Sequence, residues 1–174
     1  MRLDVPPHGR ALTAVDAVHH IDLVVSDLER SLAFYRDLLR PLGYVREGGI
    51  RGERGEVVVY LDRVEGGTSI GLRQAQSDAG AVPYDRYGVG VHHIAFLAHS
   101  RSMVDERAAW LRDNGVEIES GPQDYDYIPG YYAVFFADPD GIKLEILHRP
   151  ADPDLAAALR ALAERLAALE AVLT

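Results

Sequence analysis

Apolar and polar residues alternate along the segment from Val18 to Val25, the period of a β-strand with one buried face. Ser26 or Asp27 then provides a helix N-cap, and Gly43 is a typical helix end. Three short strands are predicted after this helix, at about 44–47, 56–61 and 69–74, with Gly48-Gly49 and 65–67 as turns. The apolar face expected for the helix consists of Leu28, Leu32, Tyr35, Leu38 and Leu39.

The same order of elements returns in the second half of the chain. A strand is predicted at 89–98, and a helix follows between its cap Ser100 and Gly115. Further strands are predicted at 116–119, 131–137 and 142–148, the last two joined by an Asp-Pro-Asp-Gly turn. Both halves therefore read β-α-β-β-β, which indicates an internal duplication of the α+β class. The expected face of the second helix consists of Met103, Ala108, Trp110 and Leu111.

The remaining segments lie outside the duplication. After Asp152-Pro153, leucines recur at alternating steps of four and three residues, which predicts an amphipathic C-terminal helix. This helix either packs on its own domain or forms a homodimer contact, although roughly three heptads are short for a free coiled coil. The expected organisation is an N-terminal arm (1–14), a first βαβββ module (15–75), a polar connector (76–87), a second module (88–149) and the helix (152–173).

Composition narrows the classes of partner and site. The 174 residues carry a formal charge of −9, which argues against binding to nucleic acid or anionic membranes. Neither a membrane-length apolar run nor a secretion signal is visible, so we expect a cytoplasmic protein. Because the chain contains no cysteine, disulfides and thiolate ligands are excluded, and any metal must bind to His, Asp or Glu.

A histidine doublet opens the first strand of each half. His19-His20 precedes Ile-Asp-Leu, and His92-His93 precedes Ile-Ala-Phe, so His20 and His93 lie 73 residues apart. Strand alternation directs His20 and His93 away from the helix side of their sheets. His19 and His92 are expected on the helix side or at the strand entrance, in a structural or supporting role.

A carboxylate occupies the same kind of position in the last strand. Ile142, Leu144 and Ile146 form its apolar face, so Lys143 and Glu145 point the opposite way. A carboxylate in an apolar strand is costly unless it is paired or coordinated. Two imidazoles and this carboxylate would form a divalent-metal site with open positions. Ordinary core or surface histidines and a salt-bridged Glu145 are the alternative, and the repeated histidine favours the metal.

A tyrosine-rich loop at 124–132 precedes the strand that leads to this glutamate. Its four tyrosines are candidates to close over a substrate, and Tyr131 and Tyr132 are the candidate catalytic hydrogen-bond donors or general acids. A packed aromatic rim is the alternative for any one of them. Asp22 shares a face with His20, and it either supports that histidine or pairs with an arginine.

Three stretches, 20–35, 91–96 and 135–146, resemble the vicinal oxygen chelate superfamily, which includes glyoxalase I, fosfomycin-resistance and bleomycin-resistance proteins and extradiol dioxygenases. The resemblance spans about residues 15–149. It implies that the two modules form a cupped mixed sheet around a divalent metal. The ligands it implies are His20, His93 and Glu145.

Departures from the family patterns bear on the reaction. Glyoxalase I has a fourth ligand at the position of Gly71, which lies 51 residues after His20 as Glu145 lies 52 after His93. Extradiol dioxygenases have a tyrosine where this chain has Phe135, and the fosfomycin enzymes have an arginine beyond the glutamate, where only Arg149 is available. The bleomycin-binding branch usually lacks the metal ligands.

Two functions of different classes are left open. The first is a divalent-metal-dependent enzyme (Fe, Mn, Ni, Zn or Mg), a lyase or isomerase or a ring-cleaving dioxygenase, that chelates a small oxygenated metabolite through two oxygens. The second is a binding protein of the bleomycin-resistance type that sequesters a small molecule. The sequence does not decide whether the modules pair within one chain or between chains.

Overall fold

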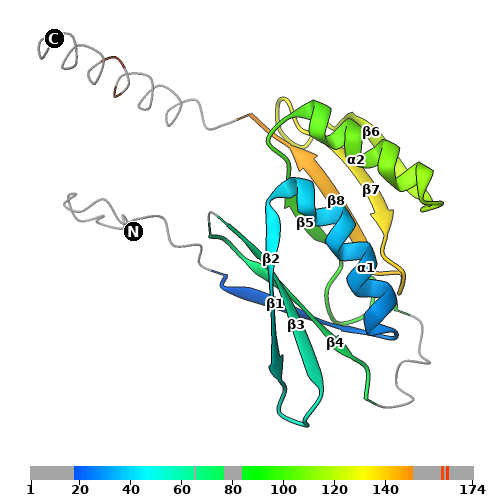
Figure 1. The fold of residues 1–174 in the computed structure, drawn as a ribbon. Coiled ribbons are helices and arrows are strands. Elements are labelled where there is room, and N and C mark those ends of the chain that lie inside the picture. The colour runs from blue at the N-terminus through cyan, green and yellow to red at the C-terminus, as the bar shows by residue number, and fades with distance from the viewer. Residues whose placement is uncertain (1–17, 65, 77–83, 151–161, 163, 165–174) are drawn as a thin grey trace, which may run out of the picture. The chain divides into compact units, whose positions relative to one another are not determined.

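The computed structural model describes residues 18–64, 66–76, 84–150, 162 and 164. The chain divides between Ala81 and Val82 into two compact units, each with one α-helix and one four-stranded mixed sheet (Figure 1). The two helices and eight strands of these described residues confirm the predicted α+β class. The predicted arm at 1–14 lies outside the described residues, as does nearly all of the helix predicted at 152–173.

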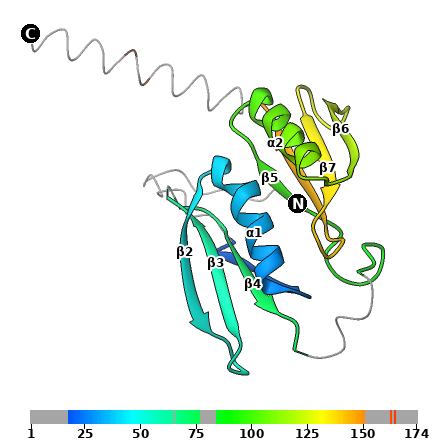
Figure 2. The ribbon, with the colours of Figure 1, turned by 45° about the vertical axis from the view of Figure 1, so that its right-hand side comes forward.

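The first unit has the strand order β1-β4-β3-β2, in which β1 pairs parallel to β4 and the other pairs are antiparallel. The helix α1 lies against this sheet and contacts β4 and β2 (Figure 2). The elements are β1 (His20–Val25), α1 (Leu28–Leu39), the 3-10 helix η1 (Arg40–Leu42), β2 (Tyr44–Arg51), β3 (Val57–Arg63) and β4 (Ser69–Gln74).

The boundaries of α1 follow the expected capping chemistry. The Asp27 carboxylate accepts a hydrogen bond from the Arg30 backbone N–H at 3.0 Å, and Gly43 ends the segment at a φ of 94°. The predicted turn at Gly48-Gly49 is wrong, because β2 runs through both glycines and pairs them with Tyr60 and Val59. Glycine has no side chain to pack, so this exposed stretch is held in the sheet by its backbone hydrogen bonds. The buried face of α1 consists of Ser31, Leu32, Tyr35, Leu38 and Leu39.

The second unit repeats this topology with the order β5-β8-β7-β6. Its helix α2 packs on the sheet and contacts β6, β7 and β8 (Figures 1 and 2). Within the described residues, no helix is both long and apolar enough to cross a membrane. The elements are β5 (Ile94–Leu97), α2 (Arg101–Asp113), β6 (Ile118–Asp124), β7 (Tyr132–Ala137) and β8 (Lys143–His148).

The helix α2 begins as predicted, but its buried face is shifted from the expected one. The Ser100 hydroxyl accepts from the Met103 N–H at 3.2 Å, which confirms the N-cap. The buried residues are Val104, Ala108 and Leu111, while Met103 and Trp110 are only half-buried. Residues at i, i+4 and i+7 share one helix face, so Val104 lies on the same face as Ala108 and Leu111. The sequence analysis did not include Val104 in that face.

The strand predicted at 89–98 is wrong at its start, because β5 begins only at Ile94. The Tyr84 hydroxyl contacts the Val91 carbonyl and donates to the His92 carbonyl at 3.3 Å. The carbonyls of Val91 and His92, which a longer strand would use for pairing, are therefore occupied by the Tyr84 hydroxyl. The second histidine doublet therefore lies immediately before the strand, in a segment without regular secondary structure.

Candidate metal centre in the second unit

Strand register makes Gly71 and Glu145 equivalent positions. In the first unit Asp22 on β1 lies opposite Gly71 on β4, and in the second Ala95 on β5 lies opposite Glu145 on β8. Asp22 lies two residues after His20, and Ala95 lies two residues after His93. The equivalence expected from residue counting is therefore confirmed.

Glu145 is the most deeply buried acid among the described residues of the second unit. It is 1% exposed, and its Oε2 lies 3.3 Å from Nε2 of His93, while its Oε1 accepts a 2.6 Å hydrogen bond from the Tyr131 hydroxyl. Phe135 lies directly opposite on β7. Alternation along β8 and the approach of the loop before β7 thus bring His93, Glu145 and Tyr131 together.

The Tyr131 hydroxyl is held as a hydrogen-bond donor. Burial raises the pKa of this phenol well above its ordinary value, and the hydrogen bond to Glu145 raises it further. The hydroxyl therefore stays protonated at neutral pH, and it fixes one carboxylate oxygen while the other faces His93.

These groups line a cavity of about 450 Å³ that lies wholly within the second unit. One wall is aromatic, since the rings of Tyr125 and Tyr127 stack at 5.4 Å and the ring of Phe135 stands edge-on to Tyr125 at 5.2 Å. The loop that carries the tyrosines is closed by the Tyr125 N–H, which donates to the Tyr131 carbonyl at 2.9 Å. Three of the four loop tyrosines thus line the cavity.

Tyr132 faces the helix instead. Its hydroxyl donates to Asp105 on α2 at 2.6 Å, and the Arg101 guanidinium lies 4.0 Å from its ring centre. Tyr132 is the first residue of β7 and Tyr131 immediately precedes it, and the two side chains lie on opposite sides of the sheet. The structure brings Tyr131 to the cavity and does not bring Tyr132 there.

Three charged residues form a group that the sequence analysis did not identify, and two of them, Glu119 and Lys143, line the cavity. Lys143 donates to Glu119 at 2.7 Å and Arg86 donates to the other oxygen of Glu119 at 2.6 Å. The hydrogen bond from Arg86, and then that from Lys143, lowers the pKa of Glu119 below its ordinary value. Alternation along β8 predicted Lys143 on this side, but no sequence signal linked Glu119 to it, because β6 pairs with β7 and not with β8.

In the first unit, His20 stands beside a network of charged groups. Its ring lies edge-on to Tyr60 at 5.6 Å, and both residues line a cavity of about 420 Å³. The carboxylate of Asp22 is bound by the Arg73 guanidinium and accepts from the Tyr60 hydroxyl at 3.3 Å. Of the two roles considered for Asp22, pairing with an arginine is the one that the structure shows.

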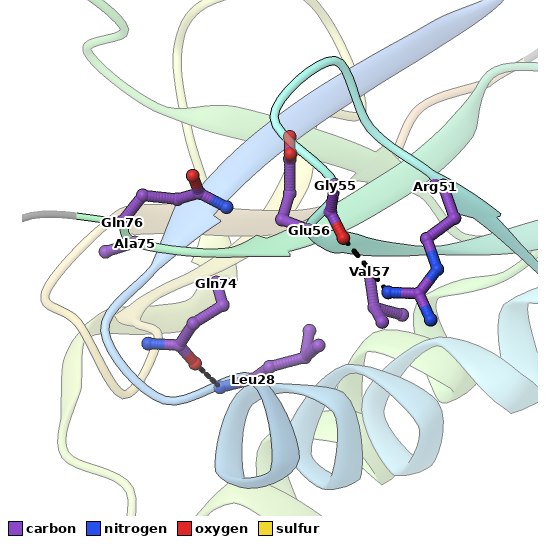
Figure 3. Close-up of a pocket in the computed structure, with 8 residues that line it drawn as sticks. All are labelled: Leu28, Arg51, Gly55, Glu56, Val57, Gln74, Ala75 and Gln76. Carbon is purple, nitrogen blue, oxygen red and sulfur yellow. Dashed lines mark hydrogen bonds between the residues drawn. The ribbon is translucent and has the colours of Figure 1, made fainter.

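A further cavity, of about 530 Å³, lies at the start of α1 (Figure 3). Gln74 turns toward the helix there, and its side-chain oxygen accepts from the Leu28 N–H at 2.9 Å. Arg51 donates to the Gly55 carbonyl at 3.0 Å, within the connection between β2 and β3 (Figure 3). None of the predicted site residues lines this cavity.

The donors in the second unit fit part of a divalent-metal site. Among the described residues, no group of three or more His, Asp or Glu side chains is close enough to hold a metal ion. His93 and Glu145 form an adjacent imidazole and carboxylate, the donor types that suit divalent transition metals. The third predicted ligand, His20, belongs to the first unit.

Comparison with known proteins identifies the family. The model of the Glyoxalase/Bleomycin resistance protein/Dioxygenase superfamily matches residues 17–146. The chain belongs to this superfamily. The match covers both units and confirms the resemblance seen in the sequence motifs.

Individual relatives agree with this placement. The chain is 34% identical over 135 residues to the Bacillus subtilis protein YqjT, which covers 75% of this chain and 97% of that protein. It is 32% identical over 133 residues to the metallothiol transferase FosB of Staphylococcus epidermidis, covering 76% and 81%. A glyoxylase/bleomycin resistance protein/dioxygenase domain from Frankia has the same fold, with a TM-score of 0.61 and 22% identity over 79% of this chain and all of that one.

Proposed function

We propose that this superfamily member is a divalent-metal-dependent enzyme whose ligands are His20, His93 and Glu145. The observation that carries the proposal is the environment of Glu145, a nearly fully buried carboxylate in the middle of a strand. Among the described residues, its close polar contacts are an imidazole and a phenol, not a guanidinium or ammonium group. A buried carboxylate needs a compensating charge, and a metal cation supplies one.

The remaining features of the cavity suit a small substrate. A divalent ion held by three side chains keeps open positions at which two neighbouring substrate oxygens can bind and be polarised. Tyr131 holds the carboxylate of Glu145 in place and keeps its proton. The aromatic wall of Tyr125, Tyr127 and Phe135 excludes water from one side of the cavity.

The reaction class we favour is Lewis-acid chemistry, with thiol transfer to be tested first. Several relatives at about 30% identity are named metallothiol transferases, and this name refers to both a metal and a thiol. This chain has no cysteine, so the thiol would be a second substrate. Lyase or isomerase chemistry, which also uses the metal as a Lewis acid, is the alternative reaction that we propose. Ring-cleaving dioxygenation is less favoured, because Phe135, opposite Glu145, offers no acidic or basic group.

Sequestration of a small molecule is the second candidate. The stacked pair Tyr125–Tyr127 beside Phe135 forms an aromatic surface on which a planar ligand can stack. This function requires the cavity but not the metal ligands. Metal content therefore separates the two candidates.

Elemental analysis of the purified full chain tests the proposal. We expect a stoichiometric divalent ion in the wild-type protein and background levels in His93→Ala, because removal of one of three ligands leaves too few donors. His99→Ala removes an imidazole from outside the proposed site and should retain the metal. Retention of the metal by His93→Ala, or a wild-type protein that takes up no ion on reconstitution, would remove the enzyme proposal, and the second result would favour sequestration.

A mixing experiment decides which units complete the site. His20→Ala and His93→Ala are each inactive for metal binding if both ligands are needed. If the units pair between two copies of the chain, a mixed dimer contains one intact site and regains metal uptake; if they pair within one chain, the mixture regains none. The expected homodimer stays a prediction, because most of the C-terminal helix lies outside the described residues.

A further inference from the structure

The two histidine doublets share one unusual geometry. Nδ1 of His19 lies 3.0 Å from Nδ1 of His20, and Nδ1 of His92 lies 2.8 Å from Nδ1 of His93. The rings are edge-on in both doublets, with centroids 5.2 and 5.0 Å apart. His19, His92 and His93 lie outside the strands, so strand alternation does not set the directions of these rings, yet both doublets have the same ring contact.

The contact between two Nδ1 atoms restricts the position of the protons. In a pair of neutral imidazoles, one Nδ1 must carry the proton and donate, while the other must accept. A histidine that binds a metal through Nε2 has its lone pair there and its proton on Nδ1. If His20 and His93 are ligands through Nε2, then they donate, and His19 and His92 accept.

His93 presents its two ring nitrogens to two different acceptors, Glu145 and His92, and the assignment places its proton on the His92 side. Its Nε2 is the ring atom that faces Glu145, at 3.3 Å, while its Nδ1 faces His92. His92 is itself held, because the Tyr87 ring lies edge-on to it at 5.6 Å and the Tyr84 hydroxyl donates to its backbone carbonyl. The acceptor is therefore placed by the segment that precedes β5.

The first unit repeats the arrangement without the acid. Gly71 stands there in place of Glu145, yet the contact between His19 and His20 is the same. The backbone carbonyl of His19 accepts from the Ser69 N–H at 2.9 Å, which ties that doublet to β4. Both units have the Nδ1–Nδ1 contact, although only the second has a glutamate at the equivalent position. The contact therefore does not depend on the carboxylate.

We propose that His19 and His92 are positioning residues, whose Nδ1 atoms accept the Nδ1 protons of His20 and His93 and so keep each Nε2 lone pair directed out of the doublet. The proposal deepens the proposed function, since its purpose is to orient two ligands of that site. Partners of this kind fix the ring orientation and tautomer of ligand histidines in metalloproteins. Here the partner is a second imidazole supplied by the preceding residue.

The opposite proton arrangement is distinguishable. If His93 donated from Nε2 to Glu145, its Nδ1 would accept from His92 and its Nε2 would have no free lone pair. Long-range proton–nitrogen NMR correlations distinguish the two ring tautomers, and the signals of His93 are assigned by their loss in His93→Ala.

The first measurement uses the metal-free full chain. We expect His93 to carry its proton on Nδ1 in the wild type and to lose this preference in His92→Ala. His92→Asn places an amide oxygen near the position of the lost Nδ1 and should restore it, and His99→Ala should leave it unchanged. A wild-type His93 protonated on Nε2, or a tautomer that is indifferent to His92→Ala, would overturn the proposal whether or not the protein binds metal.

The second measurement is a competition titration with Zn²⁺ against a chelator. His92→Ala and His19→Ala should each weaken Zn²⁺ binding about tenfold or more, as loss of such a partner does elsewhere. His92→Asn should recover most of this affinity. If the wild type binds Zn²⁺ and both alanine variants bind it equally well, the positioning role fails while the proposed function stands. If the wild type binds no Zn²⁺, the proposed function fails, and the tautomer measurement still decides the role of His92.

Discussion

Each unit has a carboxylate on its pair of parallel strands, which is β1 and β4 in the first unit and β5 and β8 in the second. The carboxylate lies on the first strand of the pair in one unit and on the last strand in the other. In the first unit the acid is Asp22 on β1, and the opposite residue on β4 is Gly71. In the second unit the acid is Glu145 on β8, and the opposite residue on β5 is Ala95. Topology and register are otherwise the same, so the difference lies in the side chains alone.

The surroundings of the two acids assign them different roles. Asp22 is bound by Arg73, which also donates to Glu56 at 3.1 Å, and it accepts from Tyr60. Its charge is thus neutralised within the fold. Glu145 contacts the imidazole of His93 and the hydroxyl of Tyr131, and neither contact is with a guanidinium or ammonium group. One scaffold therefore holds a structural acid in one copy and a candidate ligand in the other.

The largest expected effect is the loss of the charge partner in the first unit. Arg73→Met leaves Asp22 and the nearly buried Glu56 without their cation, and we expect a loss of about 3 kcal/mol in the free energy of unfolding. Urea denaturation of the full chain measures it. Arg36→Met is the matched control, since it removes a half-exposed pair with Glu47 and should cost less than about 1 kcal/mol. Equal losses in the two variants would show that the Asp22 network is not structural.

A smaller effect is expected from adding a methyl group at Gly71. A Cβ there would overlap Oδ1 of Asp22 and would lie 2.7 Å from Cε1 of Tyr60, so Gly71→Ala should cost about 2 kcal/mol. In an Asp22→Ala background the first overlap is gone, and a double-mutant cycle should give a coupling of about 1 kcal/mol. Additive losses in urea denaturation would mean that Asp22 does not fill the space beside Gly71.

The smallest effect on stability is expected at Glu145. Glu145→Gln keeps an oxygen that accepts from Tyr131 and removes a buried charge, so the free energy of unfolding should change by less than about 1 kcal/mol. Metal uptake should nevertheless be lost. A strongly destabilised variant in urea denaturation would place Glu145 with Asp22 among the structural acids, and the comparison between the units would no longer hold.

Sequence periodicity predicted the elements where local rules dominate. The strand β4 and the starts of both helices agree with their predicted positions, because alternation, N-caps and Gly43 act within a few residues. Errors occur where another segment decides the outcome. Gly48-Gly49 remain in β2 because β3 pairs with them, and β5 begins late because Tyr84 binds the carbonyls before it.

The sequence by itself determined the duplication, the α+β class and the facing of Lys143 and Glu145, since the period of two in a strand is a property of the backbone. Only the tertiary structure decided that Tyr131 and not Tyr132 reaches the cavity, that Asp22 is held by Arg73, and that each doublet joins its rings through Nδ1. These contacts depend on strand pairing and loop closure between residues far apart in the chain or on ring orientation, none of which the local pattern specifies.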